Sequence, residues 1–261
     1  MGPNWRDYNM VWFRFYGQLN DFLPAQWRYG RFARPLHAPA SVKDVIESLG
    51  VPHPEVDVIT ANGAAIDFTY RVGADDHIAV YPVFRNMDVD GLQRVGIDPP
   101  RPVRFALDIH LRKLASLLRL AGFDAVLLTD DAEVAAVSAR EDRVALTRDV
   151  GLLKRSVIQY GRWIRNTDAE QQLVEVLDRF GIVDEMHPFA RCMECNTPVV
   201  HVDIASIADR LPADTREAFT EFRRCPGCER VYWQGSHYVR LVDLLERARQ
   251  RCGIGMRSQT L

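Results

Sequence analysis

The chain has 261 residues, of which 47% are hydrophobic and 26% charged, a balance typical of a globular protein with roughly two or three modest domains. The formal net charge is only -2 and no segment is strongly basic, so a polycationic arm for nucleic acid is excluded and any such binding must come from local patches. No apolar run approaches the ~20 residues of a membrane span, and residues 1–8 lack a secretion signal, so we expect a cytoplasmic protein.

Residues 11–84 predict a compact β-rich domain. Its single helix covers 41–50, where Ser41 is a favourable N-cap, apolar side chains recur at helical spacing and Gly50 ends the pattern. Strand-like runs surround the helix at 11–16, 32–36, 56–60, 65–70 and 77–84. Two strands, a helix and further short strands make the order of a β-grasp domain.

This stretch resembles the ubiquitin-like sulfur carriers of molybdopterin and thiamine biosynthesis, notably in Val58-Ile-Thr-Ala-Asn-Gly63 and Ala79-Val-Tyr-Pro82. Those carriers end in Gly-Gly, whose carboxylate is thiolated. Here the chain continues through Asp90-Gly91, so we do not expect carrier chemistry. A module that docks a protein partner or binds substrate is the favoured interpretation.

A stiff break follows at Pro99-Pro-Arg-Pro102, because proline favours extended backbone and donates no hydrogen bond to a sheet. We therefore predict a β-grasp domain at 1–90 and a Pro-rich linker at 91–102. An α/β domain would occupy 103–183, and a zinc ribbon with a C-terminal helix would occupy 184–261.

From Val103 onwards, predicted strands and helices alternate. The strands fall at 103–107, 124–128, 144–146 and 162–164. The helices fall at 111–121, 132–140, around 152–153 and at 168–180. Such alternation predicts a parallel sheet with helices on both faces.

Acidic residues directly follow three of these strands. They are Asp108, the pair Asp130 and Asp131, and Asp149. In a parallel open sheet these strand ends lie along one edge, where ligands bind. Converging carboxylates repel one another unless a cation neutralises them, and hard oxygen ligands select Mg²⁺ or Mn²⁺. Such ions can position and deprotonate a water and stabilise the leaving oxygen of a phosphodiester.

Basic residues lie near these acids in the sequence and could hold a polyanionic substrate. The candidates are His110, Arg112, Lys113, Arg148, Lys154 and Arg155. For Arg112 and Lys113, an ordinary solvated helix face is an equally good interpretation.

The acids also have structural interpretations. Asp131 and Asp149 open helices and could be N-caps, which is the expected role of Asp168. Glu133 lies one turn into a helix and is a weak fourth candidate. Asp108 is harder to explain in this way, because it directly follows an apolar strand and precedes a basic helix.

Two Cys-x-x-Cys motifs lie near the C-terminus, Cys192-Met-Glu-Cys195 and Cys225-Pro-Gly-Cys228. The two-residue gap lets both sulfurs of a pair reach one ion at ~2.3 Å, so the four thiolates predict a tetrahedral Zn²⁺ site. The 29 intervening residues exceed the common spacing but leave the ligand set intact. Two disulfides or free thiols are the alternatives, and the expected cytosolic location disfavours disulfides. Cys252 has no expected role.

A zinc ion with four cysteine ligands has no open position for water, so we expect a structural site. Tyr232, Trp233 and His237 follow the second pair and could stack on bases or pack the small ribbon, with packing favoured. The polar stretch between the pairs is helix-prone around 212–223, which predicts an elaborated ribbon.

Three motifs together resemble the PIN-related Mut-seven C-terminal RNase family. In that family a strand-end Asp precedes a helix of the form L-x-x-L-A-x-x-L-R-x-x-G, as in residues 105–124 here. Leu146-Thr-Arg-Asp-Val-Gly-Leu-Leu-Lys154 resembles the family's L-T-R-D-x-x-L-L, and residues 224–237 resemble its zinc-ribbon ending. The resemblance covers residues 103–240.

The resemblance implies a PIN-like α/β domain with a metal-dependent RNase site, followed by a structural zinc ribbon. Asp108 and Asp149 carry over best as catalytic residues, and either Asp130 or Asp131 falls at the position of a further ligand. The family's N-terminal ubiquitin-like extension fits residues 11–84. The alternative is a non-catalytic RNA-binding adaptor, in which the ribbon and basic residues hold RNA and the β-grasp domain docks a protein partner.

Overall fold

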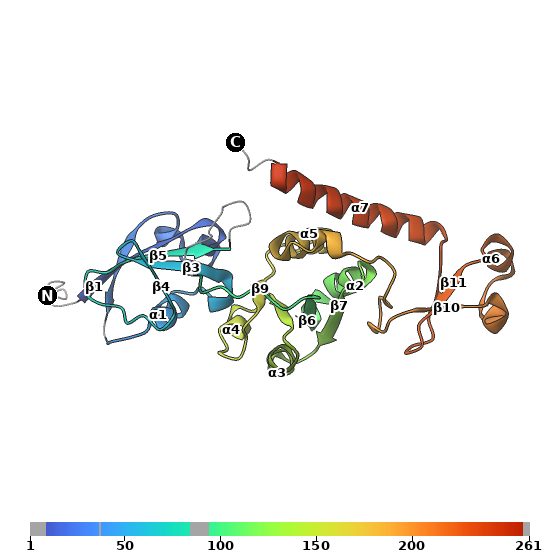
Figure 1. Ribbon diagram of the computed structural model, residues 1–261, viewed down its shortest axis with the longest axis horizontal. Coiled ribbons are helices and arrows are strands. Elements are labelled where there is room, and N and C mark those ends of the chain that lie inside the picture. Colours follow the sequence, from blue (N-terminus) through green and yellow to red (C-terminus); the bar gives the residue numbers. More distant parts are fainter. Residues whose placement is uncertain (1–8, 37, 84–93, 258–261) are drawn as a thin grey trace. The chain divides into compact units, whose positions relative to one another are not determined.

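The structure is a computed structural model that describes residues 9–36, 38–83 and 94–257 (Figure 1). The chain divides into two compact units, one of residues 1–99 with 138–163 and the other of residues 100–137 with 164–261. The end of the last predicted N-terminal strand at Phe84, the dipeptide 90–91 and linker residues 91–93 lie outside the described residues. Among the helices of the described ranges, none is both long enough and apolar enough to cross a membrane.

The first unit contains a mixed five-stranded sheet in the order β2-β1-β5-β3-β4. Its strands are β1 (Asn9–Phe15), β2 (Phe32–Leu36), β3 (Val56–Ala61), β4 (Ala64–Ile66) and β5 (His77–Pro82). Strand β1 runs parallel to β5, and the other neighbours pair antiparallel. Helix α1 (Val42–Ser48) begins after Ser41, whose hydroxyl accepts a hydrogen bond from the Asp44 amide as the sequence predicts. The predicted β-grasp class is confirmed.

The core of this sheet follows from alternation along its strands. Val11, Phe13 and Phe15 of β1 are buried together with Val42 and Ile46 of α1. The intervening side chains of β1 therefore point away from α1, because successive residues of a strand face opposite sides of a sheet.

Two segments differ from the sequence-based prediction. Strand β4 ends at Ile66 rather than continuing to residue 70, because the Asp67 carboxylate accepts hydrogen bonds from the amide and hydroxyl of Thr69 and forms a turn. Part of the predicted linker is fixed to the domain. The amides of Val95 and Gly96 donate to the Asp57 carbonyl, and the Arg94 guanidinium lies 2.9 Å from the buried Asp57 carboxylate.

The first unit also holds β8 (Val144–Thr147), α4 (Val150–Leu153) and β9 (Gly161–Trp163), with β8 and β9 parallel. A buried ion pair fastens β9 to the β-grasp domain. Arg162 Nη1 lies 2.7 Å from Glu55 Oε2, and both side chains are at most 4% exposed. Glu55 Oε1 also accepts a hydrogen bond from the Trp163 amide, and Gln18 accepts one from Arg162 Nη2.

The second unit contains β6 (Arg104–Asp108) and β7 (Asp124–Leu128), which pair in parallel. Its helices include α2 (Arg112–Leu120), α5 (Ala169–Phe180) and α7 (Ser236–Arg257), and α3 (Asp131–Glu141) begins after β7. Helix α5 packs on α2 and α7, and Figure 1 shows α7 running beside α5. Asp168 caps α5 as predicted, accepting from the Gln171 amide. These parallel strand pairs and their helices confirm the predicted parallel-sheet α/β class.

A small antiparallel sheet forms the ribbon, with strands β10 (Val200–Val202), β11 (Phe222–Arg224) and β12 (Val231–Trp233) in that order. Helix α6 (Ala213–Ala218) is shorter than the helix-prone stretch 212–223, because Phe222 to Arg224 join the sheet instead. Cys252 is buried on α7, where its Sγ lies 3.9 Å from the Val174 carbonyl of α5.

The Glu55–Arg162 pair gives the first prediction. We expect Glu55→Ala to lower the free energy of unfolding by about 3 kcal/mol or more, because it leaves the buried Arg162 guanidinium without this carboxylate. Arg140→Ala is the matched control, since it removes an exposed pair with Glu141 and should change stability by less than about 1 kcal/mol. Urea unfolding followed by circular dichroism measures both, and equal losses would contradict the assigned role of the buried pair.

Candidate catalytic acids and metal centre

Asp108 and Asp130 stand at the carboxyl ends of neighbouring parallel strands. Asp108 is the last residue of β6 and lies opposite Leu128 of β7, two residues before Asp130. Asp108 is 7% exposed, whereas Asp130 is exposed and Asp131 is half-buried at the start of α3. The parallel register thus brings these acids to the same end of the strand pair.

Each of these carboxylates is oriented by the helix that follows it. Asp108 Oδ1 accepts a hydrogen bond of 2.8 Å from the His110 amide. Asp130 Oδ1 accepts from the amides of Ala132 and Glu133, at 2.8 and 3.0 Å. The capping bonds that the sequence suggested for Asp131 are therefore made by Asp130, one residue earlier.

Asp149 belongs to the first unit, where it caps α4. Its Oδ1 accepts a hydrogen bond of 2.7 Å from the Gly151 amide, and its own amide donates to the hydroxyl of the buried Thr147. A Cβ at Gly151 would lie only 3.1 Å from Asp149 Oδ1, so glycine allows this close approach. The exposed carboxylate is held in one orientation by its own loop.

The predicted basic residues have different surroundings. Arg112 and Lys113 are exposed at the first turn of α2, and His110, Arg148 and Arg155 are exposed as well. Lys154 is half-buried and its Nζ donates a hydrogen bond of 2.7 Å to the carbonyl of Glu47 in α1. Lys154 thus also helps to attach α4 to the β-grasp domain, and its role in substrate binding stays a prediction.

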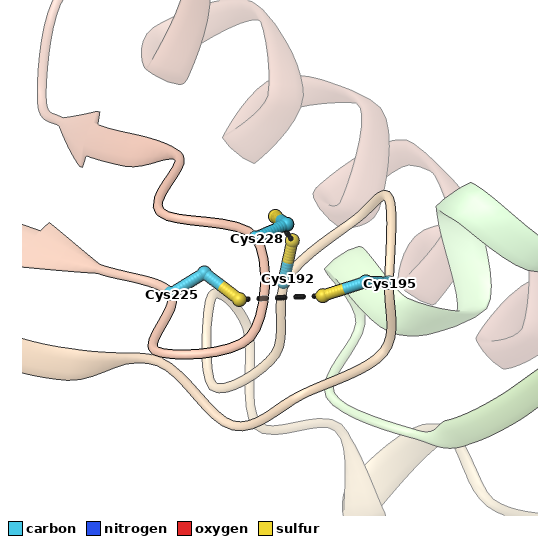
Figure 2. Close-up of side chains that lie close together, drawn as sticks. All are labelled: Cys192, Cys195, Cys225 and Cys228. Carbon is cyan, nitrogen blue, oxygen red and sulfur yellow. Dashed lines mark hydrogen bonds between the residues drawn. The ribbon is translucent and has the colours of Figure 1, made fainter.

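The four cysteines of the two motifs form one cluster, with all four sulfurs within 4.8 Å of one another. Figure 2 shows the four side chains gathered together, with those of Cys195 and Cys225 pointing toward each other. Cys195 Sγ lies 3.3 Å from Cys225 Sγ, and Cys192 Sγ lies 3.5 Å from Cys228 Sγ. None of these cysteines is in a disulfide. Ligand bonds of ~2.3 Å in a tetrahedron imply sulfur separations of roughly 3.8 Å, so the thiols are arranged to bind one metal ion of the size of zinc.

The two Cys-x-x-Cys motifs, which we call the first and second knuckle, have the same backbone hydrogen bond. The Cys192 amide donates to the Thr197 carbonyl, and the Cys225 amide donates to the Arg230 carbonyl in the same five-residue pattern. The residue after each second cysteine has a positive φ, 71° at Asn196 and 62° at Glu229. A Cβ at Gly227 would lie 2.6 Å from Thr197 Oγ1, so glycine lets the second knuckle approach the first.

Hydrogen bonds fasten the first knuckle to α2 and β7. Arg119 of α2 donates to the carbonyls of Met193 and Glu194, at 3.1 and 2.6 Å. Burial lowers the pKa of this guanidinium. Asn196 accepts from the Ala125 amide and donates to the Asp124 carboxylate, at 3.1 and 2.8 Å. Sequence reasoning missed these residues, although an Asn directly after a knuckle is a signal for left-handed backbone.

Tyr232 packs against the cysteine cluster. Its hydroxyl lies 3.0 Å from Cys192 Sγ and accepts a hydrogen bond from the Met193 amide. Burial and the contact with Cys192 raise the pKa of this phenol. Trp233 remains 36% exposed and borders a cavity of about 460 Å³ between the ribbon and the start of α7. His237 and the stacked rings of Phe189 and Tyr238, 4.2 Å apart, also line this cavity.

The cluster predicts a bound metal that can be measured directly. We expect protein purified without chelator to contain about one zinc per chain by atomic emission spectroscopy. The variant Cys195→Ala/Cys228→Ala should lose it, because two ligands are too few for a closed site. Cys252→Ala is the control and should retain the metal, since Cys252 lies outside the cluster. A metal-free wild-type chain, or a double variant with unchanged zinc content, would refute the site.

Comparison with family models gave two matches. The model described as the Mut7-C RNAse domain matches residues 103–245, and that described as Mut7-C ubiquitin matches residues 8–88. Searches of curated proteins and of solved structures found no match. The first match spans more than half of the 261 residues, and both confirm the resemblance seen in the sequence. The chain therefore belongs to the Mut7-C RNase domain family and carries the ubiquitin-like domain of that family at its N-terminus.

Proposed function

We propose that this protein is a metal-dependent ribonuclease that hydrolyses RNA phosphodiester bonds. The observation that carries the proposal is the repeated placement of an aspartate at the end of β6, β7 and β8, each held by a capping hydrogen bond, within a domain of an RNase family. Strand ends of this kind are where ligands bind in parallel α/β sheets.

The proposed ligands of Mg²⁺ or Mn²⁺ are Asp108, Asp149 and one of Asp130 and Asp131. Their donors suit such an ion, because carboxylate oxygens are hard ligands. A divalent ion bound there supplies Lewis acidity towards water and the phosphate oxygens. The capping bonds of Asp130 and Asp149 fall on Oδ1 and fix the direction of each carboxylate, which favours a preorganised site.

The exposed cations of α2, Arg112 and Lys113, are proposed to bind backbone phosphates of the RNA, with Arg148 as a further contact. Lys154 would add charge while it remains bonded to the Glu47 carbonyl. The ribbon is proposed to hold a structural zinc, because a four-cysteine site leaves no coordination position for a reacting water.

The catalytic acids can be tested with a matched control. In chelator-free buffer, we expect cleavage of a labelled RNA to require added Mg²⁺ or Mn²⁺. Asp108→Asn and Asp149→Asn should each lower the rate about a hundredfold or more, because each removes a charge from the metal site while asparagine can still cap a helix. Asp168→Asn changes a helix-capping aspartate outside the proposed site and should keep full activity.

Two outcomes would contradict this assignment. Undiminished cleavage by the folded Asp108→Asn and Asp149→Asn variants would remove these acids from the mechanism. Salt-sensitive RNA binding without turnover, under any divalent metal, would favour the non-catalytic adaptor instead.

A second prediction concerns the cations of α2. The variant Arg112→Ala/Lys113→Ala should raise KM and leave kcat unchanged. It should also lower the slope of log KM against log salt concentration by about 1.4, because it removes two phosphate contacts and each contact on a single strand contributes about 0.7. Arg216→Ala, an exposed arginine of α6, is the control and should leave both quantities unchanged. An unaltered salt slope in the double variant would show that these residues form only a solvated helix face.

A further inference from the structure

The sheet of the β-grasp domain has an aromatic and basic outer face. Residues Val11, Phe13 and Phe15 of β1 and Ile78 and Val80 of β5 are buried in the core with α1. The alternate residues point to the opposite side of the sheet. This outer face carries Trp12, Arg14, Tyr16, Arg31, His77 and Tyr81, which we call the aromatic face, and each of them is half-buried or exposed.

These side chains form two ordered stacks. Trp12 lies parallel to His77, with ring centroids 6.2 Å apart, and the Arg31 guanidinium lies over Trp12 at 4.6 Å. Tyr16 stacks on Tyr81 at 4.3 Å, and the Arg14 guanidinium lies over Tyr16 at 4.9 Å. Arg31 Nη1 also lies 3.3 Å from His77 Nδ1. The other N–H groups of an arginine that rests on a ring stay available at its edges, which suits contacts with phosphate oxygens.

The arginines give the aromatic face a positive charge. Within the described ranges, the outward positions of β1, β2 and β5 include no acidic residue. The neighbouring Asp76 is buried, and its carboxylate accepts hydrogen bonds from Asn62, Tyr70 and the Gly73 amide. Exposed sheet faces are normally covered by mixed polar residues, so a face of half-buried rings and exposed arginines without acids needs a specific explanation.

We propose that the aromatic face binds single-stranded RNA, with bases stacked on its rings and phosphates paired with Arg14 and Arg31. This inference rests on the proposed ribonuclease function, which supplies the class of ligand. Sheets that present aromatic side chains bind single strands by stacking, and cations beside the rings follow the backbone. A protein partner would also use rings and arginines, but the absence of acids on these outward positions favours a polyanion.

The test measures binding separately from cleavage. Fluorescence anisotropy of a labelled oligouridylate of about ten nucleotides is recorded in buffer without Mg²⁺, Mn²⁺ or chelator, so that the zinc site is undisturbed. We expect Arg14→Ala/Arg31→Ala to weaken binding about tenfold or more at low salt. The slope of the logarithm of the dissociation constant against the logarithm of the salt concentration should fall by about 1.4, because two phosphate contacts are lost. Trp12→Leu should weaken binding about fivefold to a hundredfold with an unchanged slope, because it removes a stacking ring and keeps its apolar contacts.

The control is Arg71→Ala, an exposed arginine paired by a β-bridge with Ser41 at the start of α1, which should bind like the wild type. Thermal unfolding by circular dichroism verifies that each variant is folded. Wild-type affinity in both face variants would overturn the proposal, as would a wild-type chain that binds no single-stranded RNA. Variants that lose capture of a protein partner but bind RNA normally would assign the face to that partner instead.

The RNA-binding face and the ribonuclease activity can be tested independently of each other. Asp108→Asn should bind the oligonucleotide with wild-type affinity and lose only cleavage. If the face variants bind normally while Asp108→Asn abolishes cleavage, the ribonuclease stands and the RNA-binding face does not.

Discussion

The proposed site depends on the unpaired amides at the start of a helix. Where a helix begins directly after a buried parallel strand, its first backbone N–H groups have no partner within the helix and need an acceptor. In this chain the residue at that junction is repeatedly an aspartate, and its Oδ1 accepts from those amides after β6, β7 and β8. A cap does not require a charge, since serine or asparagine serves as well. A carboxylate cap also stabilises a helix by itself, as Asp168 does at α5. What favours a metal site is that three such caps follow the parallel strands β6, β7 and β8 in a domain of an RNase family. Capping and metal binding are compatible roles for the same carboxylate.

The cysteine cluster is coupled to the α/β fold through its first knuckle. Arg119 of α2 is bonded to two carbonyls of the knuckle, and Asn196 bridges the knuckle to the first two residues of β7. A metal that orders the knuckle thus also supports the start of the strand that leads to Asp130. Binding free energy at such a site contributes to folding, so the ribbon can stabilise the α/β unit without taking part in its chemistry.

The features that the sequence predicts well are those set by local patterns. Strands β2 and β7, the caps at Ser41 and Asp168 and the two cysteine knuckles each depend on residues within one short segment. Contacts between distant segments were not predictable, because the partner of a polar side chain is decided by tertiary packing. Lys154, bonded to Glu47, and Tyr232, against Cys192, illustrate this limit. The catalytic acids stay a prediction, because a strand end can be located from local sequence whereas convergence of the acids on one ion depends on tertiary packing.

The β-grasp domain combines a fixed attachment with an open face. Its turn at Glu55 is joined to Arg162 and Trp163 by buried bonds, and His53 is bonded to the carbonyl of Ile158. These contacts place the domain in one compact unit with the segment that carries Asp149.

The aromatic face uses none of these residues, because it lies on outward positions of β1 and β5 and their neighbours. A strand of RNA held there would therefore stay attached to a part of the proposed catalytic apparatus. Its effective concentration near that segment would rise without any new contact to the scissile bond. The domain would then act as a substrate-holding module, and loss of the aromatic face alone should affect KM more than kcat.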